Sequence, residues 1–531
     1  MAFLALSTKL FLSALGMGSF LAGNPCKPAH AATSDRLIAA VQQNPPTLEP
    51  MREFSNVAMR IVPNVLETLI DIDYKQGFAL VPGLATSWQR VDERTLELKL
   101  RRGVKCQDGS DFTAEDVVFT FGPERFLEDK APGHAVGAIL LGNIASVEAV
   151  GPYAVKVISK VPDPLLEERL ANYPAQVICK RAYQAAANWD AWSRAVIGTG
   201  PYRLAEIKPG ESITLERFDR YWGEKAPVAK VVFKEVADTS ARIAGLLTGE
   251  VDIITEVPPD QLKEIEDRER FATVGGPIRT IRMIVYNGGA KNLADRRLRQ
   301  ALNLAIDRQL IVDTVFHGRT RVPHGLQQDF FGKMYIANWP QPAYDPNKAR
   351  ELLKQAGYKG ELIHYRMVPD YYTAGVATGR ILQQMWKAVG LNVQIDFVEN
   401  WSQVYKKDDA RNIQDTSATA FFPDPASQLW RIFSPNDRYQ QEGYWANAEF
   451  DRLGQILEQS SDLQARRSAA RDMLRILDQD PPGTVLYELP VFYGKRKALV
   501  WTAYPCEFMD LRAGNLSLTG ALGSNPAQNI P

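Results

Sequence analysis

Cysteine and histidine are rare in this chain, which has four cysteines and five histidines among 531 residues. No two cysteines are spaced as C-x-x-C, which argues against a zinc ribbon or a dithiol redox motif. The histidines that follow the N-terminal segment, His134, His317, His324 and His364, include no pair at i and i+4 of a helix, a spacing at which two imidazoles bind one metal ion. We therefore expect no metal site and no cofactor.

Net charge is also absent, because 62 lysines and arginines balance 62 aspartates and glutamates. Such a chain lacks the basic surface that binds nucleic acids or anionic membranes. It also contains no G-x-S-x-G, H-E-x-x-H or G-x-x-x-x-G-K-[ST] motif, which a serine hydrolase, a zinc hydrolase or a P-loop ATPase would need. We expect no nucleic-acid partner and no enzyme activity, and a secreted hydrolase is a remote alternative.

The pattern of residues 1–31 predicts a cleavable secretory signal peptide. Lys9 precedes an apolar stretch over residues 10–23, and residues 29–31 form an A-x-A cleavage site. The stretch is about 14 residues long, whereas a membrane-spanning helix needs roughly 20. Cys26 is separated from the nearest lipoprotein-like triplet, so lipidation is not expected. The mature protein is predicted to be periplasmic.

Three cysteines remain after removal of this segment, namely Cys106, Cys179 and Cys506. An odd number allows at most one disulfide, and a buried free thiol is as compatible with each position. The sequence therefore leaves the disulfide pairing open.

The mature chain of about 500 residues is longer than a chain that folds around one hydrophobic core. Its length therefore predicts two or three domains.

Strand and helix patterns alternate along the chain, which predicts a mixed α/β protein. Period-2 alternation marks strands at residues 95–100, 154–157, 213–217 and 393–398. Apolar stripes of helical period mark helices at residues 295–316, 346–356 and 381–389. The second of these has the clearest boundaries, because Asp345-Pro346 supplies an N-cap with a first-turn proline and Gly357 supplies the C-terminal stop.

Two segments carry the most information. Residues 101–119, RRGVKCQDGSDFTAEDVVF, predict a strand end, a turn and a helix that Thr113 and Asp116 cap as a capping box. Residues 198–202, GTGPY, fail as a dinucleotide-phosphate loop, since Arg203 stands where the third glycine belongs. Both segments are therefore interpreted as structural.

These segments, with others in the same order, resemble the extracytoplasmic solute-binding proteins of family 5, the peptide, nickel and opine receptors of ABC transporters. The other matching segments are LATSW at 84–88, LER at 215–217 with YWG at 221–223, RQALNLAIDR at 299–308, YDPNKA at 344–349 and AGY at 356–358. The resemblance implies a two-lobed α/β fold, type II-like and of cluster C, with an extra domain inserted in the first lobe.

The resemblance also implies boundaries and partners. The first lobe would comprise residues 32–60, 191–280 and 485–531, the inserted domain residues 61–190, and the second lobe residues 281–484. The chain would cross between the lobes near residues 280 and 485. Such a monomer captures a small-molecule ligand by hinge closure and delivers it to ABC permease subunits that are driven by a separate ATPase.

The ligand class depends on one position. Peptide-binding relatives commonly carry an aspartate, just ahead of a Pro-Asp-Pro segment, that pairs with the peptide's amino group; here the segment AFFPDP at 420–425 places Phe421 there. A desolvated ammonium without a carboxylate is strongly penalised. This favours an opine, a sugar phosphate or an oligosaccharide, with ordinary peptides as the alternative if Asp424 or Asp415 supplies the charge.

The remaining candidates for ligand contact are aromatic and charged. Trp401, Phe421, Phe422 and Trp430 would stack on a sugar ring, Arg52 and Arg282 would bind a carboxylate or phosphate, and Tyr372 would line the cleft. The resemblance places Glu49, Met51 and Arg52 at the cleft mouth. The predicted site therefore comprises Glu49, Met51, Arg52, Arg282, Tyr372, Trp401, Phe421, Phe422, Asp424 and Trp430.

Overall fold

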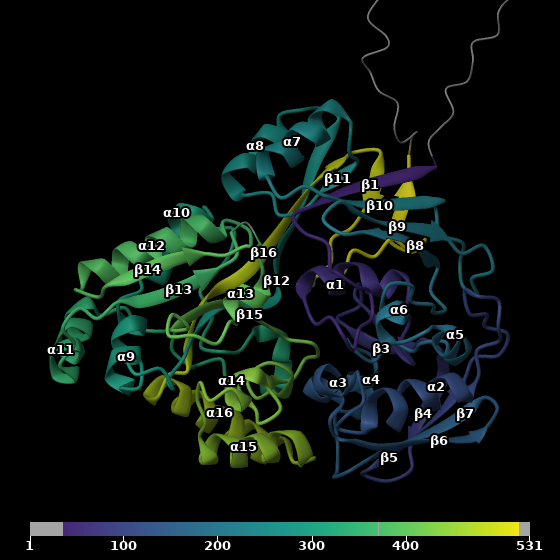
Figure 1. The fold of residues 1–531 in the computed structure, drawn as a ribbon, viewed down its shortest axis with the longest axis horizontal. Helices are drawn as coiled ribbons and strands as arrows, with labels where there is room; N and C mark the ends of the chain where they lie inside the picture. The colour runs from purple at the N-terminus through teal and green to yellow at the C-terminus, as the bar shows by residue number, and fades with distance from the viewer. Residues whose placement is uncertain (1–34, 370, 520–531) are drawn as a thin grey trace, which may run out of the picture.

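The computed structural model describes residues 35–369 and 371–519, so the predicted signal peptide lies outside the described residues. The chain forms two lobes that share one ten-stranded mixed sheet (Figure 1). Its strands, in spatial order, are β14 (Val393–Phe397), β13 (Ile363–Met367), β15 (Ile413–Thr419), β12 (Phe271–Tyr286), β16 (Gly483–Arg496), β11 (Ile253–Ile254), β1 (Arg36–Val41), β10 (Lys230–Glu235), β9 (Ser212–Arg217) and β8 (Tyr202–Lys208).

The two longest strands, β12 and β16, run diagonally through the middle of the molecule and connect its two halves (Figure 1). They pair antiparallel on both sides of a register shift that follows the facing residues Pro277 and Pro490. Proline has no N–H group, so this step of the ladder lacks backbone donors from both strands. The predicted lobe crossings near residues 280 and 485 fall on these two strands, although the lobe boundaries themselves remain predictions.

A separate four-stranded sheet lies at the lower right of Figure 1, in the order β4 (Ala85–Arg90), β5 (Thr95–Leu100), β7 (Ala154–Ser159) and β6 (Ile144–Gly151). With α2 (Ala114–Thr120) and α4 (Leu166–Leu170) it encloses its own hydrophobic core, to which Leu98, Val117 and Leu170 belong. Two short hairpin-like pairs complete the strands: β2 (Ile70–Asp73) with β3 (Ala79–Pro82), and β17 (Leu499–Trp501) with β18 (Leu516–Leu518).

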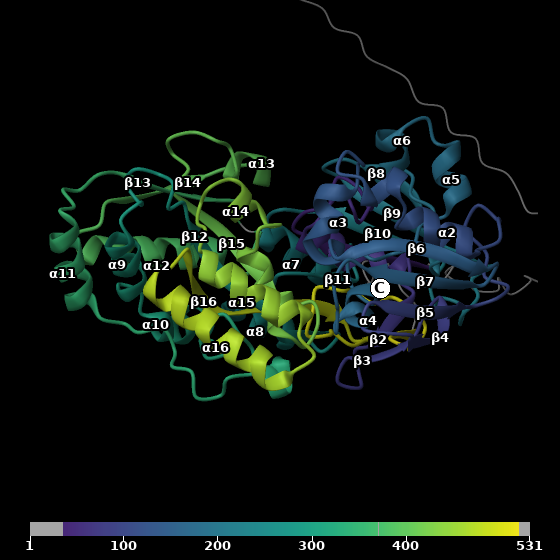
Figure 2. The ribbon, with the colours of Figure 1, turned by 90° about the horizontal axis from the view of Figure 1, so that it is seen from below.

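Helices cover both lobes, as the view from below also shows (Figure 2). The remaining ones are α1 (Asn56–Ile61), α3 (His134–Leu141), α5 (Lys180–Ala185), α6 (Trp189–Ser193), α7 (Thr239–Thr248), α8 (Leu262–Glu266), α9 (Arg296–Leu304), α10 (Arg308–Val315), α11 (Pro346–Ala356), α12 (Gly375–Ala388), α13 (Trp401–Val404), α14 (Arg438–Gln441), α15 (Ala448–Gln459) and α16 (Leu463–Gln479). None of those described has both the length and the apolar character that crossing a membrane requires.

The four predicted strands are confirmed as β5, β7, β9 and β14, and the helix at 346–356 is confirmed as α11, with Asp345 as its N-cap. The single helix predicted over residues 295–316 is wrong. It is two helices, because the Asp307 carboxylate accepts a hydrogen bond from the Leu310 amide at 2.9 Å and so starts α10 anew. Helix α12 begins six residues before the predicted residue 381, in a glycine-containing stretch that weakens the apolar pattern.

The two most informative sequence segments meet in space. The capping box of Thr113 and Asp116 is confirmed at the start of α2. Just before it, the Gln107 amide nitrogen donates to the carbonyls of Val65, Gly200 and Tyr202, at 3.0, 3.2 and 2.7 Å. A Cβ atom on Gly200 would lie 2.7 Å from the Val65 carbonyl. The glycines of residues 198–202 therefore allow close backbone packing and cradle no phosphate.

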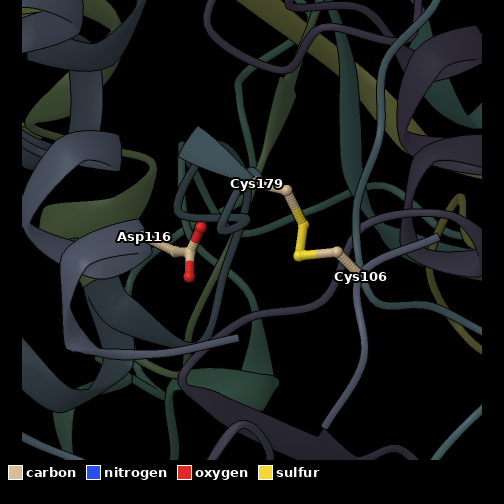
Figure 3. Close-up of side chains that lie close together, drawn as sticks. All are labelled: Cys106, Asp116 and Cys179. Carbon is tan, nitrogen blue, oxygen red and sulfur yellow. A yellow bond between two sulfur atoms is a disulfide. The ribbon is translucent and has the colours of Figure 1, made fainter. Parts of the chain in front are cut away.

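Cys106 and Cys179 form a disulfide that closes this junction, and Cys506 is a free thiol. Figure 3 shows the Asp116 carboxylate beside the bridge. These three side chains bring potential metal donors within 4.8 Å of one another. Both sulfurs are bonded to each other, however, and the Asp116 oxygens accept hydrogen bonds from the amides of Thr113 and Lys180, at 2.8 and 2.9 Å. The group is accounted for by structural bonds.

Candidate ligand-binding cleft

A cavity of about 770 Å³ lies between residues 52–59 and 135–139 on one side and residues 371–442 on the other. The first wall consists of the segment that leads into α1, together with α3. The second consists of the loop before α12, helix α13, the end of β15, and helix α14. This volume is in the range of small-molecule sites.

Contacts between the lobes bring these walls together. The Thr373 hydroxyl donates to the Glu256 carboxylate, and the Gln42 side chain donates to the Tyr371 carbonyl at 3.2 Å. Arg169 forms an ion pair with Glu458 at 2.8 Å. These bonds join residues 42, 169 and 256 to residues 371, 373 and 458, so they hold the two sides of the molecule together around the cavity.

Aromatic rings make up much of the second wall. Trp401 packs edge-to-face against Tyr371 and Tyr372, with ring centroids 4.8 and 6.1 Å apart, and stacks on Tyr405 at 5.9 Å. The Trp401 indole nitrogen is buried and has no hydrogen-bond partner among the described residues. The rings of Phe421 and Phe54, which both line the cavity, pack against each other with centroids 5.4 Å apart. These rings present apolar faces of the kind that stack on sugars.

Of the charged residues that line the cleft, Arg431 and Asp437 are buried. Burial raises the pKa of Glu53, and it raises the pKa of Asp437 to about 6 against the opposing charge of Arg431. Burial also lowers the pKa of the Arg431 guanidinium, which lies 5.2 Å over the Phe421 ring. Among the described residues Arg431 has no ion-pair partner. Arg438, which lies 3.8 Å over the Tyr405 ring, is a second arginine of this wall without an ion pair among the described residues.

Four predicted site residues line this cleft: Arg52, Tyr372, Trp401 and Phe421. The guanidinium of Arg52 forms an ion pair with Asp190. The Tyr372 hydroxyl donates to Ser417 at 3.1 Å. Their contact with a ligand remains a prediction, but the structure brings the four together.

The two acids that were considered as replacements for the missing aspartate are held elsewhere. Asp415 forms a buried ion pair with Arg282 and accepts a hydrogen bond from Tyr365 at 2.6 Å. Asp424 pairs with Arg466 at 2.7 Å and caps the turn that follows it. Neither acid is among the residues that line the cleft, so neither supplies the charge that Phe421 lacks.

The other predicted residues lie in packed interior. Glu49 is fully buried, pairs with Arg125 and accepts a hydrogen bond from Trp192, while Met51 is buried beside Arg125. Trp430 packs so tightly on Gly454 that a Cβ atom there would lie 2.1 Å from the ring. Phe422 lines a small side cavity of about 30 Å³ next to Phe421. Arg282 is fully buried by its pair with Asp415. The structure does not place these five residues in the wall of the cleft.

Sequence reasoning missed Arg431 and Glu53, which line the cleft, whereas Tyr371 was considered together with Tyr372. Each missed residue directly follows a predicted one, since Arg431 follows Trp430 and Glu53 follows Arg52. The segments were therefore recognised, but the side of each segment that faces the cavity was not. The backbone geometry of each segment decides which of its side chains face the cavity.

Comparison with known proteins settles the family. Residues 79–440 match the model of the bacterial extracellular solute-binding proteins, family 5. The chain belongs to this family. The resemblance that the sequence segments indicated is thereby confirmed.

Relatives and solved structures agree with this assignment. The glutathione-binding protein GsiB of Salmonella choleraesuis is 30% identical over 357 residues, which is 66% of either chain and so just under two thirds of that protein. The periplasmic binding protein DppA of Helicobacter pylori, solved with the peptide STSA, has a TM-score of 0.82 at 20% identity and covers 91% of this chain and 98% of its own. AgaA of A. tumefaciens R10, solved with agropinic acid, has a TM-score of 0.79 at 19% identity, with 91% and 99% covered.

These likenesses confirm the two-lobed fold predicted for this family 5 protein. The proteins named above are binding proteins and not enzymes by their descriptions. Their ligands are chemically different from one another, so family membership does not fix a ligand for this chain.

Proposed function

We propose that this protein is the periplasmic substrate-binding component of an ABC importer, and that its ligand is a small polar organic solute such as an opine, a sugar phosphate or an oligosaccharide. One observation carries the proposal. The ring of Phe421 lines the cleft where an amino-group anchor would stand, and both nearby acids, Asp415 and Asp424, are committed to arginines. A protonated amine at this point would lose its hydration without gaining a carboxylate.

The cleft offers this kind of solute two complementary surfaces. The faces of Tyr371, Tyr372 and Trp401 suit a sugar or polyol chain, and Arg431 suits a carboxylate or phosphate. A ligand that touches both walls would favour the closed lobes, because it makes its full set of contacts only there. The closed protein would then deliver the solute to permease subunits, with energy from a separate ATPase, and it would act as a monomer.

Peptide import is the second candidate, and a specific observation supports it. Glu53 and Asp437 both line the cleft, so an acid is within the cavity even though none stands at position 421. GsiB and the solved DppA bind glutathione and a peptide, respectively. A peptide would have to place its amino group against one of these two carboxylates.

A thermal-shift screen of the mature protein separates the candidates. The probes are di- and tripeptides, opines, sugar phosphates, oligosaccharides and nickel, since a ligand that binds only the folded state raises the melting temperature. A rise with opines or sugar derivatives alone supports the proposal, and a rise with peptides supports the second candidate. Turnover of any bound probe, followed by product analysis, would instead indicate a hydrolase.

Replacing Phe421 with aspartate is expected to weaken binding of an anionic solute by about tenfold or more, since it adds a like charge and removes a stacking surface in a desolvated site. Peptide affinity should stay level or rise. Isothermal titration of the solute and of a dipeptide measures both effects. The matched control is Phe421→Leu, which keeps the site apolar and should cost only a few-fold. Unchanged affinities in Phe421→Asp would place the binding site elsewhere.

A further inference from the structure

A smaller chamber of about 80 Å³ adjoins the cleft. The two cavities share the lining residues Met59, Thr419 and Phe421, so Phe421 stands at the boundary between them. Segments far apart in the chain close the chamber, among them residues 66–74, Arg279 at the middle of β12, and residues 506–508 after β17. Its size suits one small ionic group and not a whole solute.

Arg279 in this chamber is a buried cation without a counter-charge. Its side chain is 7% exposed, and it forms no ion pair with any residue that the structure describes. The guanidinium lies over the rings of Phe78 and Phe330, at 4.0 and 4.6 Å. It donates to the Phe421 carbonyl at 3.4 Å and also contacts the Cys506 thiol. Its Nε has no partner. A desolvated guanidinium in this state has unused capacity to bind an anion.

Glu507 lines the same chamber and is also unsatisfied. It is 4% exposed, and its Oε1 has no hydrogen-bond partner in the described part of the chain. Burial, together with the charge of Glu256 and against that of Arg60, raises the pKa of Glu507 to about 8. The raised pKa favours the protonated carboxylic acid, which can donate a hydrogen bond to an anion.

The other acids of the chamber are already bonded. Asp71 pairs with Arg512 at 2.7 Å. Glu67, whose pKa burial raises to about 6, accepts hydrogen bonds from Thr199, Tyr221 and Trp222. The remaining titratable groups near Glu507 are Tyr371, Tyr493 and Cys506, and burial raises the pKa of each. Of these groups Cys506 contacts Arg279 through a hydrogen bond, and as a protonated thiol it brings no counter-charge.

We propose that the chamber is an anion subsite, in which Arg279 and Glu507 together bind the carboxylate or phosphate end of the solute. This rests on the proposed function, because the rest of that solute would occupy the cleft beyond Phe421. The subsite explains why the Arg279 Nε and the Glu507 Oε1 are left buried without a hydrogen-bond partner beside a single small chamber.

Two simple anions test the subsite without knowledge of the solute. Acetate and inorganic phosphate, each at 50 mM and at constant ionic strength, are added to the mature protein, and the melting temperature is followed. We expect a rise of about 2 °C in the wild type and a loss of that rise in Arg279→Gln. Arg452→Gln, which removes an exposed arginine, is the matched control and should keep it. A rise with acetate alone indicates a carboxylate end, and one with phosphate alone a phosphate end.

A pH series gives a second readout that a purely structural role would not produce. The acetate-dependent rise should shrink in the wild type between pH 6.5 and pH 9.5, because Glu507 ionises and then repels the anion. In Glu507→Gln the amide still donates, so the rise should stay equal at both pH values. The variant should fold well, since it no longer buries an ionisable group above pH 8.

Equal shifts in wild type, Arg279→Gln and Arg452→Gln would mean a general salt effect and would overturn the subsite. A wild-type response that does not depend on pH would overturn the role of Glu507. If the anions bind as expected but no opine or sugar derivative does, the proposed function fails while the subsite stands. If those solutes bind and the anions do not, only the subsite fails.

Discussion

Arg282→Met should lower the free energy of unfolding by about 3–5 kcal/mol, because it leaves the carboxylate of Asp415 buried and uncompensated. Both side chains are at most 1% exposed. Besides its ion pair with Asp415, Arg282 donates to the Thr416 carbonyl at 2.6 Å and lies 4.0 Å over the Tyr372 ring. Urea unfolding, monitored by tryptophan fluorescence, measures the loss.

The double variant Arg282→Met with Asp415→Leu is the matched control. It removes both charges, so most of the lost stability should return, as happens when buried ion pairs are replaced by apolar side chains. Burial already raises the pKa of Asp415 in the wild type. Without Arg282 that pKa should rise further, so the single variant should recover stability as the pH falls and the acid is protonated. A single variant within about 1 kcal/mol of the wild type would contradict this account.

Removal of the disulfide should have an effect of similar size. The bridge joins residues 73 positions apart, and a closed loop of that length stabilises the folded state by about 4 kcal/mol in the chain-entropy account. Cys106→Ala with Cys179→Ala should therefore unfold at a lower urea concentration. The loss of stability should be largest around Gln107 and α2. Faster amide hydrogen exchange in these segments of the double variant would show it.

Reductant provides the control for this experiment. Dithiothreitol should lower the stability of the wild type towards that of the double variant, and it should leave the double variant unchanged. If the reductant destabilises the double variant as strongly as the wild type, its effect does not act through this bridge. Cys506 remains present in both proteins, so its thiol does not distinguish them.

Local features of the fold were predictable from sequence, and long-range pairings were not. The alternation at residues 95–100 and the capping box at Thr113 depend on neighbours within a few positions, and both are confirmed. The break between α9 and α10 was missed because the apolar stripe continues across it, and only the bond from Asp307 to the Leu310 amide ends the first helix.

The site shows the same division. Phe421 was predicted to line the cleft from its place ahead of Pro423, and it does line it. Arg282 was predicted to bind a carboxylate or phosphate, and Asp424 to supply the charge that Phe421 lacks, but their partners Asp415 and Arg466 lie 133 and 42 positions away. The chamber around Arg279 and Glu507 is formed by segments that are far apart in the chain, so no local sequence pattern could predict it.

The paired prolines of β12 and β16 have a consequence for transport. A two-stranded ribbon with one step that lacks backbone donors can twist there without breaking hydrogen bonds elsewhere. Both predicted crossings between the lobes fall on that ribbon, so the lobes would turn about a single axis. The end point of the turn would then be set by the protein's own contacts, such as that of Glu256 with Thr373. A permease would therefore contact the same protein surface whichever solute is bound. The choice of solute would be made when the solute binds the cleft, before the protein docks on the permease.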